Sequence, residues 1–124
     1  MSISIYYTAR RDSPLSSVER SEMASLIAKY SVDLIISKYL ETGEGLNWES
    51  FCVYPPDPKE PRIIFEGATK LPDNTSDALW EGTQHWCELL SGIRRAIADA
   101  EWSAHIDDHD LVWDSKRHEY DPSQ

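Results

Sequence analysis

LPDNTSDALWEGTQHWCELLSGIRRAIADA, residues 71–100, carries the clearest helical pattern in the chain. Its apolar residues recur at steps of three or four positions, which is the spacing of one face of an α-helix. We therefore predict a helix over residues 77–99, capped by Ser76 or Asn74. The face expected to be buried consists of Leu79, Thr83, Trp86, Leu90, Ile93 and Ile97.

The residues at the N-terminus predict one strand followed by a long helical region. Residues 2–9 alternate between apolar and polar side chains, as a half-buried strand does. Ser16 and Glu19 have the spacing of a capping box, which predicts a helix start there. The helical pattern continues to Leu40, with a kink or cap expected near Ser31, and it ends at Gly43-Glu44-Gly45.

Three further strands are expected, two of them around a proline-rich loop. Residues 48–54, WESFCVY, and residues 62–68, RIIFEGA, are rich in residues that favour strands. The four prolines between them predict a rigid, exposed loop of hairpin type. Residues 102–106 alternate again and predict a fourth strand, which residues 111–113 extend or supplement. A polar tail is expected from about residue 115 to 124.

The order of these elements is strand, helix, strand, strand, helix, strand. It predicts a single α+β domain over residues 1–124, built as a two-layer sandwich with an antiparallel sheet and two main helices on one face. The order βαββαβ favours a ferredoxin-like topology. A chain of 124 residues with 40% hydrophobic residues, five Trp, six Tyr and two Phe can bury one core of this kind.

The charge of the chain indicates which partners it binds. Twelve Lys and Arg stand against 22 Asp and Glu, for a net charge of -10. Such a surface repels phosphate groups, which argues against nucleic acid and against an anionic membrane. No apolar run approaches the roughly 20 residues of a membrane helix. The N-terminus lacks the pattern of a secretory signal, and Cys52 and Cys87 lack CxxC spacing, so a cytoplasmic protein with reduced cysteines is expected.

HIDDHD, residues 105–110, is the first candidate for chemistry. On a strand, His105, Asp107 and His109 would share a face, and their side chains are ligands for zinc, iron or manganese. Same-face neighbours on a strand are roughly 6 to 7 Å apart, which is wide for one ion, and Asp107-Asp108 is also a turn signal. We therefore expect no metal and no other cofactor. A small metal-dependent or acid–base enzyme using these three residues is the alternative.

Other catalytic patterns are weak. The chain has no GxSxG, HExxH or glycine-rich phosphate loop. His85 and Cys87 are two positions apart, so on a helix they point in different directions, and Cys87 is predicted to be a small buried hydrophobic residue. His85 with Glu81 and Glu88 could serve acid–base chemistry, but an exposed polar helix face has the same pattern. The sequence favours binding over catalysis.

The end of the chain is the predicted binding surface. Residues 101–124 contain seven acidic and two basic residues, which is half of the net charge, and Trp113 lies among them. Interfaces combine aromatic side chains with charges that steer the partner. The alternative is that Trp113 packs against the sheet and the acidic residues are only solvated. A second acidic stretch contains Glu41, Glu44 and Glu49. The predicted site for a basic protein partner consists of Asp107, Asp108, Asp110, Trp113 and Asp114.

The stretch HIDDHDLVWD, residues 105–114, in a compact acidic chain without a catalytic motif, resembles the immunity proteins of interbacterial toxin systems. The resemblance covers the whole chain in size, charge and layout. It implies a bacterial, cytoplasmic protein-binding inhibitor, an immunity protein or antitoxin. Such a protein neutralises a basic partner, for example a toxin nuclease, by covering its active site.

Overall fold

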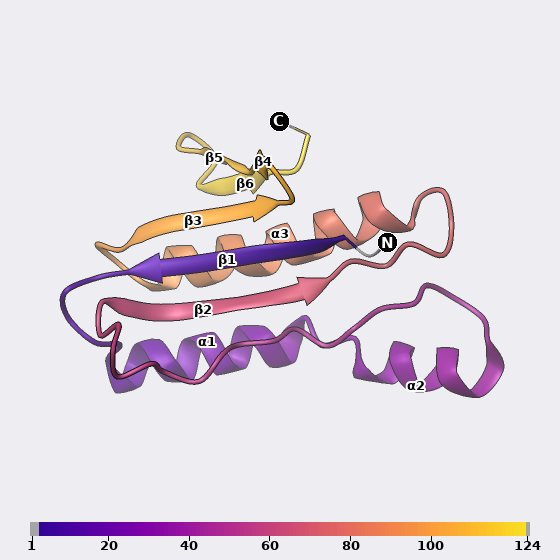
Figure 1. Cartoon of the computed structure of the whole chain (residues 1–124), viewed down its shortest axis with the longest axis horizontal. Coiled ribbons are helices and arrows are strands. Elements are labelled where there is room, and N and C mark those ends of the chain that lie inside the picture. Colours follow the sequence, from indigo (N-terminus) through magenta and orange to yellow (C-terminus); the bar gives the residue numbers. More distant parts are fainter. Residues whose placement is uncertain (1–2, 124) are drawn as a thin grey trace.

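The computed structural model describes residues 3–123, which form an α+β fold in two layers (Figure 1). A four-stranded antiparallel sheet has the strand order β2-β1-β3-β4, and β5 and β6 form a separate small sheet. The predicted α+β sandwich is confirmed. The elements are β1 (Ser4–Arg10), α1 (Ser17–Lys29), α2 (Asp33–Thr42), β2 (Ile63–Lys70), α3 (Ala78–Ala96), β3 (Glu101–Ile106), β4 (His109–Asp110), β5 (Val112–Asp114) and β6 (Glu119–Asp121).

The core lies between the sheet and α3, which runs behind β1 and β3 in Figure 1. The alternation in the first strand buries Ile5, Tyr7 and Ala9, each at most 1% exposed. Helix α3 supplies the opposite wall of the core, and α1 packs beside it. The predicted buried face is confirmed for Thr83, Trp86, Leu90, Ile93 and Ile97, whereas Leu79 is only partly buried.

The helix ends follow local signals in some places and not in others. The capping box of Ser16 and Glu19 is present, and Gly43 ends α2 at φ 73, a left-handed conformation that glycine adopts without strain. The predicted caps of α3 are wrong. Its first turn follows Asp77, whose side chain makes no capping hydrogen bond. Asn74 instead donates its side-chain amide to the Gly45 carbonyl, at 2.9 Å, and so ties two loops together.

The strand predicted at residues 48–54 is not formed. Beside the sheet, this segment is held to β2 by one backbone hydrogen bond, from Tyr54 N to Glu66 O at 2.8 Å. Two of its aromatic side chains, Trp48 and Phe51, pack against the core instead, whereas Tyr54 is exposed. The Phe51 ring lies 4.7 Å from that of Tyr7 and 5.3 Å from that of Trp86. Packing these rings against the core removes apolar surface from water, which favours this arrangement.

A buried polar network fixes this segment against the sheet. The Tyr7 hydroxyl donates to the Cys52 carbonyl and also pairs with Thr69 Oγ1 at 2.8 Å. The Cys52 amide donates to the same Thr69 oxygen at 3.1 Å. A Cβ at Gly67 would collide with both the Cys52 carbonyl and the Tyr7 ring, so only glycine permits this approach. Strands β1, β2 and β3 thus keep the neighbours of the predicted topology, while an irregular segment that packs two aromatic side chains against the core takes the place of the expected edge strand.

Residues 115–123 are part of the fold and do not form the expected polar tail, whose last residue, Gln124, lies outside the described residues. Strand β6 pairs with β5, and Tyr120 is only 4% exposed. Its amide donates to Ser91 Oγ on α3 at 2.8 Å, in a buried position. Arg95 on α3 donates to the carbonyl of His118 at 2.7 Å. These contacts fasten the small sheet to α3.

An ion pair joins the loop before α1, the first turn of α1 and the loop after α3. Both terminal nitrogens of Arg11 donate to the carboxylate of Glu19, at 2.8 and 2.9 Å. The same guanidinium donates to the carbonyls of Pro14 and Ala98, both at 2.8 Å. The two side chains are only 11% and 17% exposed. The hydrogen bonds from Arg11, with that from the Ser16 amide, lower the pKa of Glu19 to about 2.

Glu19→Gln should make the protein less stable at neutral pH by an amount that disappears in acid. Because the pKa of Glu19 is lower in the folded state, its stabilising effect is complete above about pH 4.5 and is lost as the pH falls through 2. Urea unfolding of both proteins between pH 7 and pH 2 measures this difference. The control is Glu22→Gln, at an exposed position of the same helix. A Glu19 difference that persists unchanged at pH 2 would contradict the assignment.

Candidate functional site

The HIDDHD stretch forms a hairpin at the edge of the sheet. Strand β3 turns at Asp107 and Asp108 into the short strand β4, and Asp107 has a positive φ of 50. Asx residues tolerate this conformation better than most others, so the sequence suits the turn. Asp107, Asp108 and Asp110 are all exposed. In residues 3–123 none of these three carboxylates forms an ion pair with Lys, Arg or His. We call this set the acidic hairpin.

The turn separates the three residues of the alternative metal site. His105 is paired with Asp110, and Ile106 is paired with His109. Cross-strand partners point to the same face and successive residues to opposite faces, so the two histidines lie on opposite faces of the hairpin. His105 stacks on Tyr6, at 5.0 Å between ring centroids, and its Nδ1 bonds to the Asp107 carbonyl at 2.8 Å. Within the described chain, no group of three or more His, Cys, Asp or Glu is placed to hold a metal ion.

Trp113, predicted as a contact for the partner, is packed against its own fold. The Arg94 guanidinium lies 4.1 Å from the centroid of the Trp113 ring, within the range of a cation–π interaction. The Tyr120 ring meets Trp113 edge-on at 5.1 Å. Trp113 is partly buried. Its aromatic surface therefore stabilises the attachment of the small sheet to α3. The residue is packed within the fold, as the alternative interpretation expects, but its cation partner is Arg94 of α3 and not a residue of the four-stranded sheet.

Asp114 also has a structural contact. Its Oδ1 accepts hydrogen bonds from the amides of Lys116, at 2.9 Å, and Arg117, at 3.1 Å. These bonds close the turn between β5 and β6, which is a common use of aspartate in turns. Of the five predicted contact residues, the three of the acidic hairpin are exposed, while Trp113 and Asp114 are partly buried and bonded within the fold.

The residues of the predicted helix that could be reactive lie in structural positions. Cys87 is buried, and burial raises the pKa of its thiol to about 12, so the thiol is neutral and inert at physiological pH. The Nε2 atom of His85 bonds to the carbonyl of Tyr30 at 2.8 Å. The His85 ring also packs edge-on against Trp48 and Trp86. Cys87 and His85 are therefore both accounted for by their packing within the fold.

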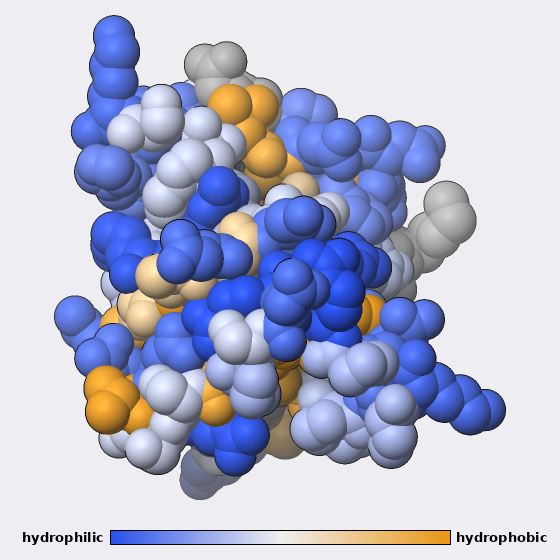
Figure 2. Space-filling view, turned by 90° about the vertical axis from the view of Figure 1, so that its left-hand side faces the viewer, coloured by the Kyte–Doolittle hydropathy of each residue, from blue (hydrophilic) through white to orange (hydrophobic). Residues whose placement is uncertain are grey.

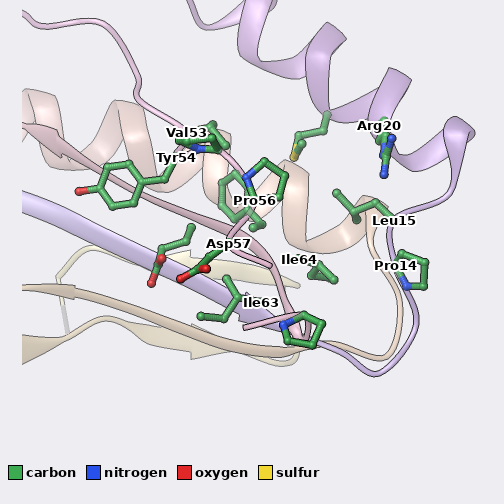
Figure 3. Close-up of a pocket in the computed structure, with 14 residues that line it drawn as sticks. Pro14, Leu15, Arg20, Val53, Tyr54, Pro56, Asp57, Ile63 and Ile64 are labelled. Carbon is green, nitrogen blue, oxygen red and sulfur yellow. The ribbon is translucent and has the colours of Figure 1, made fainter. Parts of the chain in front are cut away.

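A cavity of about 380 Å³ opens between the start of α1, the start of β2 and the proline-rich loop (Figure 3). Leu15, Val53, Pro56 and Ile63 form part of its apolar wall, while Arg20 and Asp57 lie on different sides of it. Its size suits an apolar side chain or a small ligand. The sequence did not predict this cavity, because its walls come from separate segments that only the tertiary fold brings together.

Helix α2 is a second surface that the sequence alone did not reveal. It exposes large apolar side chains, with Leu34 at 88% and Leu40 at 78%. The helix lies at one end of the molecule in Figure 1. Figure 2 views the opposite end, which is mostly hydrophilic with small, separate hydrophobic areas. The predicted helical pattern included Leu40, but a pattern cannot show whether another element covers a residue.

Comparisons with protein-family models, with curated proteins and with solved structures found nothing that matches this chain. In the described part of the chain, none of the helices has the length and apolar character needed to cross a lipid bilayer.

Proposed function

We propose that this protein is a protein-binding inhibitor, an immunity protein or antitoxin that acts in the cytoplasm by occluding a basic partner such as a toxin nuclease. The observation that carries the proposal is the acidic hairpin: three exposed carboxylates without an ion pair among the described residues. They project from the edge of the sheet, in a chain with a net charge of -10.

The physical effect of such a surface is on the approach of the partner. Exposed carboxylates attract Lys and Arg side chains over roughly 10 Å at ordinary salt concentrations, and this attraction raises the rate of association. The same charges repel nucleic acid and anionic lipids. A basic protein is therefore the partner with the chemistry that this surface recognises.

The alternative, a metal-dependent or acid–base enzyme, has less support from the geometry. It requires His105, Asp107 and His109 to converge on one point, and the hairpin places the two histidines on opposite faces. Asp107 and Asp108 stand at an exposed turn, whereas carboxylates that act as an acid and a base need a pocket that sets their pKa values apart.

Replacing Asp107, Asp108 and Asp110 together by Asn should slow association with the basic partner by about tenfold at low salt and leave dissociation nearly unchanged. The partner is isolated on the tagged protein from the native host, identified by mass spectrometry and purified. Binding kinetics are then measured at two salt concentrations.

The matched control replaces three exposed glutamates elsewhere by Gln: Glu22, Glu60 and Glu81. It changes the net charge by the same amount at other positions. If both triple variants slow association equally, only the overall charge matters. If neither variant does, or if no basic protein binds, the proposed function is wrong.

A further inference from the structure

Helix α2 is held to the rest of the protein along one side only. Val32, just before it, is 2% exposed, and Ile36 and Tyr39 are partly buried. No residue within the helix is fully buried. An isolated helix of ten residues is marginal in water and normally depends on packing of its apolar face. The other side of α2 is therefore the part of the helix that packing within the described chain does not cover.

The residues on that side combine exposed leucines with carboxylates. A helix turns by about 100° per residue, so Leu34, Ser37 and Leu40 follow one another on one side within an arc of about 120°. Glu41 falls within the same arc, and so does Asp33, whose carboxylate accepts a hydrogen bond from Ser50 Oγ at 2.8 Å. We call these five residues the α2 outer face. All five are exposed, and the two leucines are the most exposed large hydrophobic residues in the described chain.

This composition is that of a protein interface, in which an apolar centre supplies affinity and a charged rim supplies specificity. The acidic hairpin has the charges, but the ring of the nearby aromatic residue, Trp113, is in contact with the guanidinium of Arg94. The α2 outer face has what the hairpin lacks, namely large apolar side chains that are open to solvent.

The charges around the helix indicate which occupant fits. Asp33 and Glu41 flank the leucines, Glu44 follows in the next loop, and Lys38 is the one basic residue of α2. No ion pair in residues 3–123 involves any of these four side chains. In a dimer formed through this face, the carboxylates of two chains, each with a net charge of -10, would be brought together. A surface with apolar residues bordered by Lys or Arg complements it instead.

We infer that the α2 outer face is an apolar contact surface for the basic partner, with Leu34 and Leu40 inserted into an apolar groove bordered by Lys and Arg. This inference rests on the proposed function and names a second contact surface for the same partner. The two surfaces have separate kinetic effects. The acidic hairpin sets the association rate, and the α2 outer face sets the dissociation rate, because apolar contacts act only after the proteins have met.

The test uses the Leu34→Ser, Leu40→Ser double variant and the purified basic partner. Affinity should fall by at least about 30-fold, mainly through faster dissociation. Glu41→Lys should weaken binding as well, because it places a positive charge against the basic rim. The matched control is Val18→Ser, which alters an apolar residue on α1 that is 65% exposed. Circular dichroism and urea unfolding show that each variant is folded.

Three outcomes overturn the inference. Dissociation rates like that of the unmodified protein, with the hairpin variants still slowing association, would remove α2 from the interface and leave the proposed function standing. An equal loss with Val18→Ser would show a general effect of exposed apolar residues. Sedimentation that finds a dimer abolished by the double variant would make a second copy of the chain the occupant. If no basic protein binds at all, the proposed function fails together with this inference.

Discussion

Replacing Leu90 by alanine should lower the free energy of unfolding by about 2 to 5 kcal/mol. Leu90 is completely buried in the centre of α3, between this helix and the sheet. Its removal takes apolar atoms from the core and leaves a cavity that the surrounding residues fill only in part. Urea unfolding monitored by tryptophan fluorescence measures the change, provided that the transition is two-state.

The same substitution at Leu34 is the control, because that side chain is 88% exposed. Its effect should lie within about 0.5 kcal/mol of zero, since the side chain contacts mainly solvent and alanine favours a helix at least as well. Equal losses at both positions would show that the predicted face of the long helix does not form the core.

The helical part of the fold could be predicted because its signals are local. The apolar spacing along residues 77–99 requires only neighbouring turns of one helix. The structure confirms this helix as α3, although it ends at Ala96, before the predicted end at Asp99. The capping box of Ser16 and Glu19 is likewise a contact between residues three positions apart. Such patterns depend only on residues that are close together in the chain, so they can be recognised from the sequence without knowing the tertiary contacts.

The segment at residues 48–54 was misassigned because its packing depends on distant residues. Its composition suits a strand, but Phe51 stacks on Tyr7, and the Cys52 carbonyl accepts a hydrogen bond from the Tyr7 hydroxyl next to Gly67. These partners are 15 to 45 positions away in the chain. The propensity of a residue for strands reflects fit to a sheet surface, and tertiary packing overrides it.

The candidate site likewise has some features that the sequence could predict and others that depend on distant contacts. The exposure of Asp107, Asp108 and Asp110 follows from a turn signal and from charge, both of which are visible in the sequence. The contact between Trp113 and Arg94 joins β5 to α3, and no local pattern indicates it. At Leu40 the expectation fails in the other direction. A helical pattern would assign this side chain to a buried face, but no other element of the described chain covers it and it is 78% exposed.

Replacing Tyr120 by alanine should lower the free energy of unfolding by about 3 to 5 kcal/mol, as for other large buried aromatic residues. The same substitution of a tyrosine in an exposed polar tail would leave the free energy of unfolding almost unchanged. In the structure its ring is 4% exposed and packs on Trp113, and Arg94 donates to its hydroxyl at 3.2 Å. The substitution removes all of these contacts at once, including the edge-on contact with the Trp113 ring.

Tyr54→Ala is the matched control for this measurement, because Tyr54 is 46% exposed and its one backbone hydrogen bond to β2 does not involve the side chain. The loss of unfolding free energy caused by this control substitution should be below about 1 kcal/mol.

Hydrogen exchange of the Tyr120 amide, which donates to the buried oxygen of Ser91, is an independent test of the same packing. Slow exchange in the unmodified protein and fast exchange in Tyr120→Phe would not fit this packing, since phenylalanine keeps the ring and the backbone bond. Fast exchange in the unmodified protein, together with a small loss for Tyr120→Ala, would mean that the small sheet separates from α3 in solution, and Trp113 would then be free to contact a partner after all.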